Sequence, residues 1–378
     1  MVPGDFRNVR VELFGRVAFV GNPPYVRHHD IESAWKLWYA TTMARFGQRA
    51  SKLAGLHLHF VARVAELARP GDHLCFVTSA EWLDNGYGSA WRALLCDRAG
   101  PLMVQGLWVA EPRTAVFPDA LVSALVLQAE MGARSSSASL GVLQEGALST
   151  SRVVPVASLQ GEQRWTPLCQ PVLTVPTVGV ELGELFKVTR GQVTGLNGAW
   201  VLPVGSEALP AELSLPAVTR AKEIIDGTVE AADGLSRLRR VVSLPTDLAC
   251  LPLALRARVD DFLATARALG AADGYVARQR RAWHALDLRL APAAMVSYMG
   301  RRAPVFRANP HGVSFLNIAH GLYPRQPLSR QQLRPILDFL NAHTDMRAGR
   351  MYGGGMAKFE PSDIARLRVP QAVLELAR

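Results

Sequence analysis

The run Gly-Asn-Pro-Pro-Tyr at residues 21–25 carries the residue types in this sequence that are best suited to chemistry. It follows residues 16–20, Arg-Val-Ala-Phe-Val, whose β-branched and aromatic side chains fit a buried strand of an α/β sheet. The two prolines forbid continuation of the strand, so Asn22 and Tyr25 must lie on a stiff loop at its carboxyl end. Open α/β sheets bind their ligands at that end, which favours a functional loop over a plain proline-rich turn.

The Asn22-Pro23-Pro24-Tyr25 sequence resembles the catalytic motif of the TaqI-type, gamma-class N6-adenine DNA methyltransferases. An adenine amino nitrogen is a poor nucleophile because its lone pair is delocalised into the ring. The resemblance implies that the Asn22 side-chain oxygen and the Pro23 carbonyl accept its two N–H bonds, which is catalysis by positioning and electrostatics. It also implies that Tyr25 stacks on an adenine swung out of the duplex. Pro23 and Pro24 would hold the two acceptors rigid.

Asp5 and Phe6 lie shortly before this motif, where the same family has an acidic and an aromatic residue. The resemblance implies that they contact the adenine of S-adenosylmethionine, together with Asn22. The alternative for Gly-Asp-Phe is an ordinary turn. The family also carries a glycine-rich cofactor loop before this point, and the sequence offers no substitute for it. We therefore expect a companion methyltransferase subunit to carry the glycine-rich loop and to complete the S-adenosylmethionine site.

The segments downstream follow the order of the same family. Hydrophobic spacing predicts the following elements: helices over 31–46 and 56–68, a buried strand over 73–78, a loop entering a helix over 82–95, and strands over 104–109 and 120–128. Residues 116–127 resemble the last catalytic-domain motif, in which an aromatic residue packs against the other side of the flipped base. By position that residue is Phe117. The alternative is that Phe117 caps the edge of the sheet.

The second half of the chain resembles the target-recognition domain of this group of enzymes. The resemblance lies in residues 182–197, 352–359 and 366–370. Most of the net charge of +10 falls in residues 151–378, which hold 28 Lys and Arg against 19 Asp and Glu. Basic clusters beside aromatic residues suit phosphate and base-edge contacts, whereas the alternative for any one arginine is a solvated surface. The predicted DNA-binding residues are Arg278, Arg280, Arg281, Arg301, Arg302 and Lys358.

These observations predict an α/β protein of two domains. A partial Rossmann-like class I methyltransferase sheet, made of the strands of the catalytic half, is predicted for residues 1–131. The Gly-, Ser- and Ala-rich composition that follows predicts a linker over residues 132–151. A C-terminal α+β target-recognition domain is predicted for residues 152–378.

Composition excludes several other classes of protein. No apolar run approaches the length of a membrane span, and the four scattered cysteines form no metal-ligand pattern. We therefore expect no metal and no membrane. The family resemblance implies a bacterial cytoplasmic, nucleoid-associated protein with double-stranded DNA as partner. The preferred hypothesis is the catalytic and DNA-recognition subunit of a site-specific N6-adenine methyltransferase. The alternatives are a non-catalytic DNA-binding module and a methyltransferase that acts on RNA or on protein glutamine.

Overall fold

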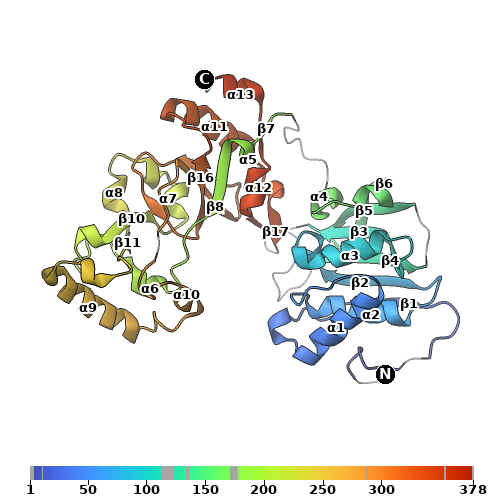
Figure 1. Ribbon diagram of the computed structural model, residues 1–378. Helices are drawn as coiled ribbons and strands as arrows, with labels where there is room; N and C mark the ends of the chain where they lie inside the picture. The colour runs from blue at the N-terminus through green and yellow to red at the C-terminus, as the bar shows by residue number, and fades with distance from the viewer. Residues whose placement is uncertain are drawn as a thin grey trace. The chain divides into compact units, whose positions relative to one another are not determined.

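The computed structural model describes residues 4–10, 12–111, 123–132, 136–170, 178–286, 288–352 and 355–376. They form two compact units, which Figure 1 shows. The first unit is Met1–Leu173 with Arg350–Met356, and the second is Thr174–Gly349 with Ala357–Arg378. Among the described residues, no helix is long and apolar enough to cross a membrane.

The first unit is built on a six-stranded mixed sheet with the strand order β1-β2-β4-β3-β5-β6. Strands β1, β2, β3 and β5 run parallel, and β4 and β6 run against them. The strands are β1 Ala18–Gly21, β2 His73–Ser79, β3 Leu102–Ala110, β4 Ala124–Met131, β5 Ser137–Gln144 and β6 Ala147–Pro155. The strands predicted around residues 16–20, 73–78 and 104–109 are therefore confirmed with small shifts of their ends.

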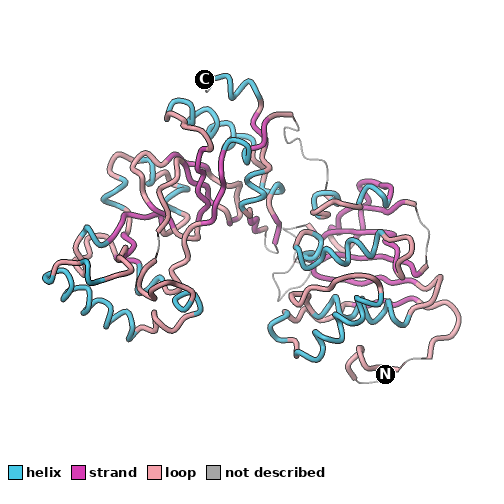
Figure 2. The backbone as a smooth tube through the Cα atoms, viewed as in Figure 1, coloured by secondary structure: helices cyan, strands magenta, loops and turns pink. Residues whose placement is uncertain are grey.

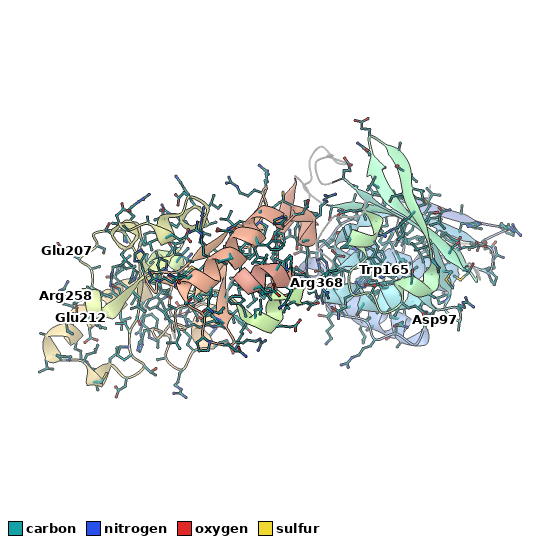
Figure 3. The ribbon with its side chains drawn as sticks, turned by 90° about the horizontal axis from the view of Figure 1, so that it is seen from above. Asp97, Trp165, Glu207, Glu212, Arg258 and Arg368 are labelled. Carbon is teal, nitrogen blue, oxygen red and sulfur yellow. The ribbon has the colours of Figure 1, made fainter. Side chains whose placement is uncertain are left out.

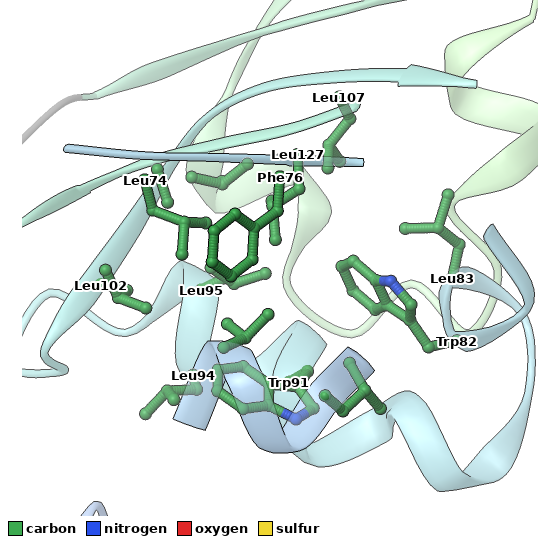
Figure 4. Packing of buried hydrophobic residues seen from close by; sticks show 14 of the residues in the cluster. Leu74, Phe76, Trp82, Leu83, Trp91, Leu94, Leu95, Leu102, Leu107 and Leu127 are labelled. Atoms are coloured by element: carbon green, nitrogen blue, oxygen red, sulfur yellow. The ribbon is translucent and has the colours of Figure 1, made fainter. Parts of the chain in front are cut away.

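Helices pack against this sheet and enclose one hydrophobic core. They are α1 Ser33–Arg45, α2 Leu56–Leu67, α3 Ser89–Cys96 and α4 Thr166–Cys169, with 3-10 turns η1 His28–Asp30, η2 Ala80–Leu83, η3 Gly86–Gly88 and η4 Val156–Leu159. Figure 4 shows Leu74 and Phe76 of the sheet above Trp91 and Leu94 of α3. The Trp91 indole also donates to the Tyr39 hydroxyl at 2.7 Å, which ties α3 to α1. The predicted helices over 31–46 and 56–68 are confirmed.

Strand β1 differs from the prediction of a buried strand. It lies at the edge of the sheet and alternates exposed and half-buried residues, and the Val20 side chain is 76% exposed. The reason is that β1 pairs only with β2 among the described residues, so its other side has no neighbouring strand.

The segment predicted as a linker also differs, because it forms strands β5 and β6. Small residues serve close packing here rather than flexibility. A β-carbon on Gly141 would lie 1.9 Å from the carbonyl oxygen of Ser149 on the paired strand, so only glycine fits. Ala138 and Leu140 of β5 are buried in the core of the first unit. The sheet therefore continues through most of residues 132–151.

The second unit mixes short helices with small sheets, as expected for an α+β domain (Figure 2). One sheet has the order β14-β12-β16-β8 and another the order β15-β10-β11-β9, while β7 pairs with β19 and β13 with β18. Their strands are β7 Val180–Glu181, β8 Phe186–Arg190, β9 Val201–Leu202, β10 Ser214–Val218, β11 Arg240–Val242, β12 Ala294–Ser297, β13 Met299–Gly300, β14 Phe306–Ala308, β15 Ser314–Phe315, β16 Ala319–Pro324, β18 Met356–Lys358 and β19 Arg368–Val369.

The helices of the second unit are short except for two, α9 and α11. They are α5 Leu182–Leu185, α6 Asn197–Trp200, α7 Lys222–Ile225, α8 Gly234–Arg237, α9 Leu253–Ala268, α10 Tyr275–Arg278, α11 Arg330–His343, α12 Pro361–Ala365 and α13 Gln371–Leu376, with 3-10 turns η5 Ala211–Leu213, η6 Thr228–Glu230, η7 Leu248–Cys250 and η8 Met346–Ala348. On α9, Arg258 donates to the carbonyl oxygen of Glu207 at 2.6 Å; both residues are labelled in Figure 3.

Candidate functional site

The carboxyl ends of β1, β2 and β3 meet at one edge of the first sheet, together with the start of β4. The backbone N–H of Ala80, just after β2, donates to the carbonyl oxygen of Ser123, just before β4, at 2.8 Å. The Asn-Pro-Pro-Tyr loop follows β1 at this same edge. The structure therefore places the predicted catalytic loop where parallel strands present a ligand site.

A cavity of about 290 Å³ opens beside the loop. It brings together the predicted residues Phe6, Asn22, Pro23 and Pro24. Its lining is Phe6, Phe19, Val20, Gly21, Asn22, Pro23, Pro24, Phe60 and Phe76. Asn22 and Pro24 are exposed and Pro23 is buried. The Asn-Pro-Pro corner, residues 22–24, is therefore packed against the protein at Pro23 and accessible to solvent at Asn22 and Pro24.

Three aromatic residues of this cavity were not predicted from the sequence: Phe19, Phe60 and Phe76. Phe60 lies on α2, and its ring stacks on that of Phe6 with centroids 5.2 Å apart. On the apolar face of a helix, a phenylalanine that lines a ligand site has the same local pattern as one that only fills the core. The sequence therefore gave no signal that could single out Phe60.

The amino-terminal segment that carries Phe6 is held against α2 and the turn before β2. Arg63 donates to the carbonyl oxygen of Val9 at 2.9 Å, and Arg69 donates to that of Leu13 at 2.8 Å. The Asp72 carboxylate accepts the backbone N–H of Val17 at 2.8 Å. These long-range bonds fix the segment between Phe6 and β1 to α2 and to the turn before β2.

Asp5 is not part of the cavity lining, although it is a neighbour of Phe6. Its carboxylate is bound by the Arg7 guanidinium and backbone N–H, and these hydrogen bonds lower the pKa of Asp5. The Arg7 guanidinium in turn lies 3.7 Å from the centre of the Trp35 ring, a cation–π contact. In this structure Asp5 therefore orders the turn that presents Phe6.

Tyr25 is half-buried, and its ring is not enclosed in the core. Burial raises the pKa of its phenol to about 12, so the hydroxyl is neutral at neutral pH. The Tyr25 ring stands at 88° to that of His57 on α2, with centroids 6.0 Å apart. The contact with His57 thus orders the Tyr25 ring at the end of the predicted catalytic loop.

The other predicted stacking residue, Phe117, lies outside the described residues. Near the strands that flank its segment there is a second hollow of about 20 Å³, lined by Glu81, Ser123 and Tyr352 among others. That volume holds about one water molecule and is too small for a base. Beside it, the Arg350 guanidinium donates to the Asn85 side chain.

The six predicted DNA-binding residues fall into two groups. Arg278, Arg281, Arg301 and Arg302 are exposed, which is compatible with phosphate contacts. Two others are engaged within the protein. Arg280 donates to the carbonyl oxygens of Val193, Thr194 and Trp283, and Lys358 pairs with Glu360 at 2.8 Å.

Burial lowers the pKa of the Arg280 guanidinium, as expected for an arginine that bonds backbone carbonyls in a partly desolvated site. The geometry of Arg280 thus favours a structural role.

The cavity residues fit part of an S-adenosylmethionine site. Stacked aromatic rings suit an adenine base, and the exposed Asn22 offers a polar group at the rim. The volume of about 290 Å³ is just below the range of about 300–1,000 Å³ that small-molecule sites occupy. Val20, at the open edge of β1, forms one wall and is largely exposed. The described residues therefore enclose one side of such a ligand.

Comparisons with known proteins identify the family of the chain. Residues 17–100 match the family model of the Eco57I restriction-modification methylase, and residues 177–378 match that of the C-terminal domain of the type II methyltransferase M.Eco57I. The chain is 41% identical to the type II methyltransferase M.XamI of Xanthomonas campestris pv. amaranthicola over 371 residues, which are 97% of this chain and 70% of M.XamI.

A solved structure of the type IIL restriction-modification enzyme MmeI in complex with DNA shares the fold. Its TM-score is 0.55 and its sequence identity 11%, and the match covers 95% of this chain and 46% of the MmeI chain. With the family matches to both units and the relative at 41% identity, the chain belongs to the Eco57I-type family of type II restriction-modification DNA methyltransferases.

Proposed function

We propose that this chain is the catalytic and DNA-recognition part of a site-specific N6-adenine DNA methyltransferase. The observation that carries the proposal is the cavity at the carboxyl end of β1, where Phe6, Asn22, Pro23 and Pro24 come together. Family membership supports DNA as the substrate, and the Asn-Pro-Pro-Tyr sequence supports an exocyclic amino group as the acceptor.

Asn22 and Pro23 act as the acceptors of the adenine amino group. The side-chain oxygen of Asn22 and the backbone carbonyl of Pro23 are fixed by the flanking prolines, so the two N–H bonds are held in one orientation. The nitrogen lone pair then points away from both acceptors, toward the methyl donor. Charge that develops on the nitrogen is stabilised by these preorganised dipoles.

Tyr25 and Phe117 hold the extruded base between them. A base must leave the duplex before its amino group can reach Asn22 and Pro23, and stacking on aromatic side chains offsets part of that cost. Tyr25 is half-buried and close to Asn22 in the chain, which supports its role as one of the two stacking residues.

Phe6 and Phe60 hold the methyl donor from one side, with Asn22 at the rim. S-adenosylmethionine, when bound, supplies an electrophilic methyl group that needs no metal. The aromatic slot excludes water from the adenine of the donor and fixes its plane.

A companion polypeptide completes the cofactor site by adding a strand beside β1. The N–H of His73 donates to the carbonyl oxygen of Val17 at 2.9 Å, so the backbone groups of residues 17, 19 and 21 face β2. Those of Ala18 and Val20 therefore face the open side, where a further parallel strand can pair. An apolar strand with a free edge pairs readily with another chain, and the exposed Val20 side chain adds apolar contact area.

The experiment is methyl transfer from labelled S-adenosylmethionine to duplex DNA, with and without the companion polypeptide. The proposal predicts N6-methyladenine in the digested DNA only when both polypeptides are present. Methylation of cytosine, RNA or protein would contradict the substrate, and full activity of this chain alone would contradict the companion. Specific DNA binding without any methylation by the pair would instead favour a non-catalytic binding module.

A further inference from the structure

His57 is a buried histidine that the proposed chemistry does not use. It lies in the first turn of α2 with 4% of its surface exposed, and its Nε2 atom is buried with no hydrogen-bond partner among the described residues. Burial, with a smaller contribution from His59, lowers the pKa of His57 to about 3. The ring is therefore neutral at neutral pH. A buried polar atom without a partner is costly, so a histidine at this place needs an explanation.

The ring of His57 is set against that of Tyr25. The two planes stand at 88° with centroids 6.0 Å apart, which is the edge-to-face arrangement that aromatic pairs favour. Such a pair covers at most one face of the tyrosine ring. His57 itself therefore does not prevent a base from stacking on the ring.

The backbone next to both residues is tied together as well. The N–H of Leu56, the first residue of α2, donates to the carbonyl oxygen of Val26 at 3.0 Å. Gly55 precedes the helix and offers no side-chain cap, so the carbonyl of Val26 takes the place of a capping group. The Leu56–Val26 bond thus joins the start of the helix to the catalytic loop at the residues next to His57 and Tyr25.

Gly55 makes this junction tight. A β-carbon at Gly55 would lie 2.9 Å from Cε1 of His57 and 3.3 Å from the carbonyl oxygen of Val26. The backbone of Gly55 is in an ordinary extended conformation, so glycine is needed here for space alone. The His57 ring therefore has little freedom to turn.

We infer that His57 is a positioning residue that sets the orientation of the Tyr25 ring. This inference rests on the proposed function, in which Tyr25 stacks on the extruded adenine. The helix supplies the rigidity, the neutral imidazole supplies the edge-to-face contact, and Gly55 and the Leu56–Val26 bond fix the distance. Loss of the ring at position 57 removes this contact and widens the range of rotamers that Tyr25 can take.

The first test needs no activity. The full chain is labelled with 3-fluorotyrosine, and the ¹⁹F resonance of Tyr25 is assigned by its loss in Tyr25→Phe. We expect His57→Phe to retain one narrow Tyr25 line, because it keeps an aromatic edge, and His57→Leu to broaden that line or to move it toward the position of the free amino acid.

His59→Leu is the matched control, because His59 is equally buried on the same helix but stacks on Tyr39, with ring centroids 4.4 Å apart. It should leave the Tyr25 line unchanged. Equal Tyr25 spectra for His57→Leu and His59→Leu would overturn the inference.

The second test is kinetic and uses the chain together with its companion polypeptide. His57→Leu should lower kcat by about tenfold to a hundredfold, the range expected for a misplaced reacting group, with little change in KM for DNA. His57→Phe should restore kcat, and Gly55→Ala should behave like His57→Leu. An unchanged kcat in His57→Leu would contradict the inference. If wild type itself methylates no adenine, the proposed function fails, while the ¹⁹F spectra still decide the role of His57.

Discussion

The rings of Phe6 and Phe60 lie stacked with their centroids 5.2 Å apart and their planes 28° from parallel. This contact joins the amino-terminal segment to α2, and both rings line the cavity beside Asn22. The proposed cofactor slot is therefore made of two elements that are more than fifty positions apart in the sequence.

Phe60→Ala should weaken S-adenosylmethionine binding by the reconstituted enzyme by about tenfold, since a stacking contact of about 1.4 kcal/mol corresponds to that factor. Calorimetric titration of the complex measures the effect. Phe46→Ala is the control, because Phe46 packs against the same core but does not line the cavity. Similar weakening in both variants would mean that general destabilisation, and not the slot, explains the loss.

The edge of β1, which has no paired strand on its outer side among the described residues, predicts that a charge placed there weakens binding of the companion polypeptide. Val20→Lys places a charge on that edge, which is how natural proteins block strand pairing, so it should abolish co-purification with the companion polypeptide. Val153→Lys is matched to it, because Val153 is 64% exposed on β6, the opposite edge strand of the same sheet. Binding of the companion by both variants at the level of wild type would rule out strand pairing at the β1 edge.

The arginines of residues 278–281 predict two different phenotypes. Arg278→Gln and Arg281→Gln remove exposed charges, and each lost phosphate contact should reduce the slope of log binding constant against log salt by about 0.9. Arg280→Gln removes a donor to the carbonyl oxygens of Val193, Thr194 and Trp283, so it should lower thermal stability and leave the salt slope unchanged. A reduced slope in Arg280→Gln with normal stability would reverse this assignment.

Local sequence predicted the helices and most strands of the first unit because their apolar spacing is regular. It also indicated residues 22–25 as candidate site residues, since their types suit the chemistry, and the structure places Asn22, Pro23 and Pro24 beside a cavity. Two features depended on tertiary structure. Residues 137–155 are rich in small residues that local rules assign to a linker, yet Gly141 allows close pairing of β5 with β6. The ring contacts of Phe60 with Phe6 and of His57 with Tyr25 arise only because α2 packs against distant segments.

The sequence also does not show which arginines of a basic cluster are exposed to solvent. Arg278, Arg280 and Arg281 are alike in the sequence, but only the fold shows that Arg280 is engaged by backbone carbonyls. Clustering of arginines therefore indicates a basic surface without telling which members face solvent.

The buried histidines of α2 predict a loss of stability in mild acid. Burial lowers the pKa of His57 to about 3 and that of His59 to about 4, while both are near 6.5 in an unfolded chain. The charged neighbours of His59 are Arg7, Asp5 and Lys36, and His57 faces His59. Between pH 6.5 and about 4 the unfolded chain binds more protons, so the free energy of unfolding must fall as pH falls.

Urea unfolding between pH 7.5 and 4.5 measures this dependence, with an upper limit of about 1.4 kcal/mol per pH unit for each histidine. His57→Phe and His59→Phe should each flatten the profile because they remove a titrating group. Equal pH profiles for wild type and both variants would show that other groups control acid stability.

In the proposed mechanism, the rigid Asn-Pro-Pro corner binds the amino group of an extruded adenine. The most direct measurement is the single-turnover rate of methyl transfer by the reconstituted enzyme carrying Asn22→Ala, alongside its affinity for the same DNA. The proposed mechanism requires a rate lower by about a hundredfold to a thousandfold, as for loss of one preorganised polar contact to the reacting group, with DNA affinity unchanged. A rate close to that of wild type would contradict it.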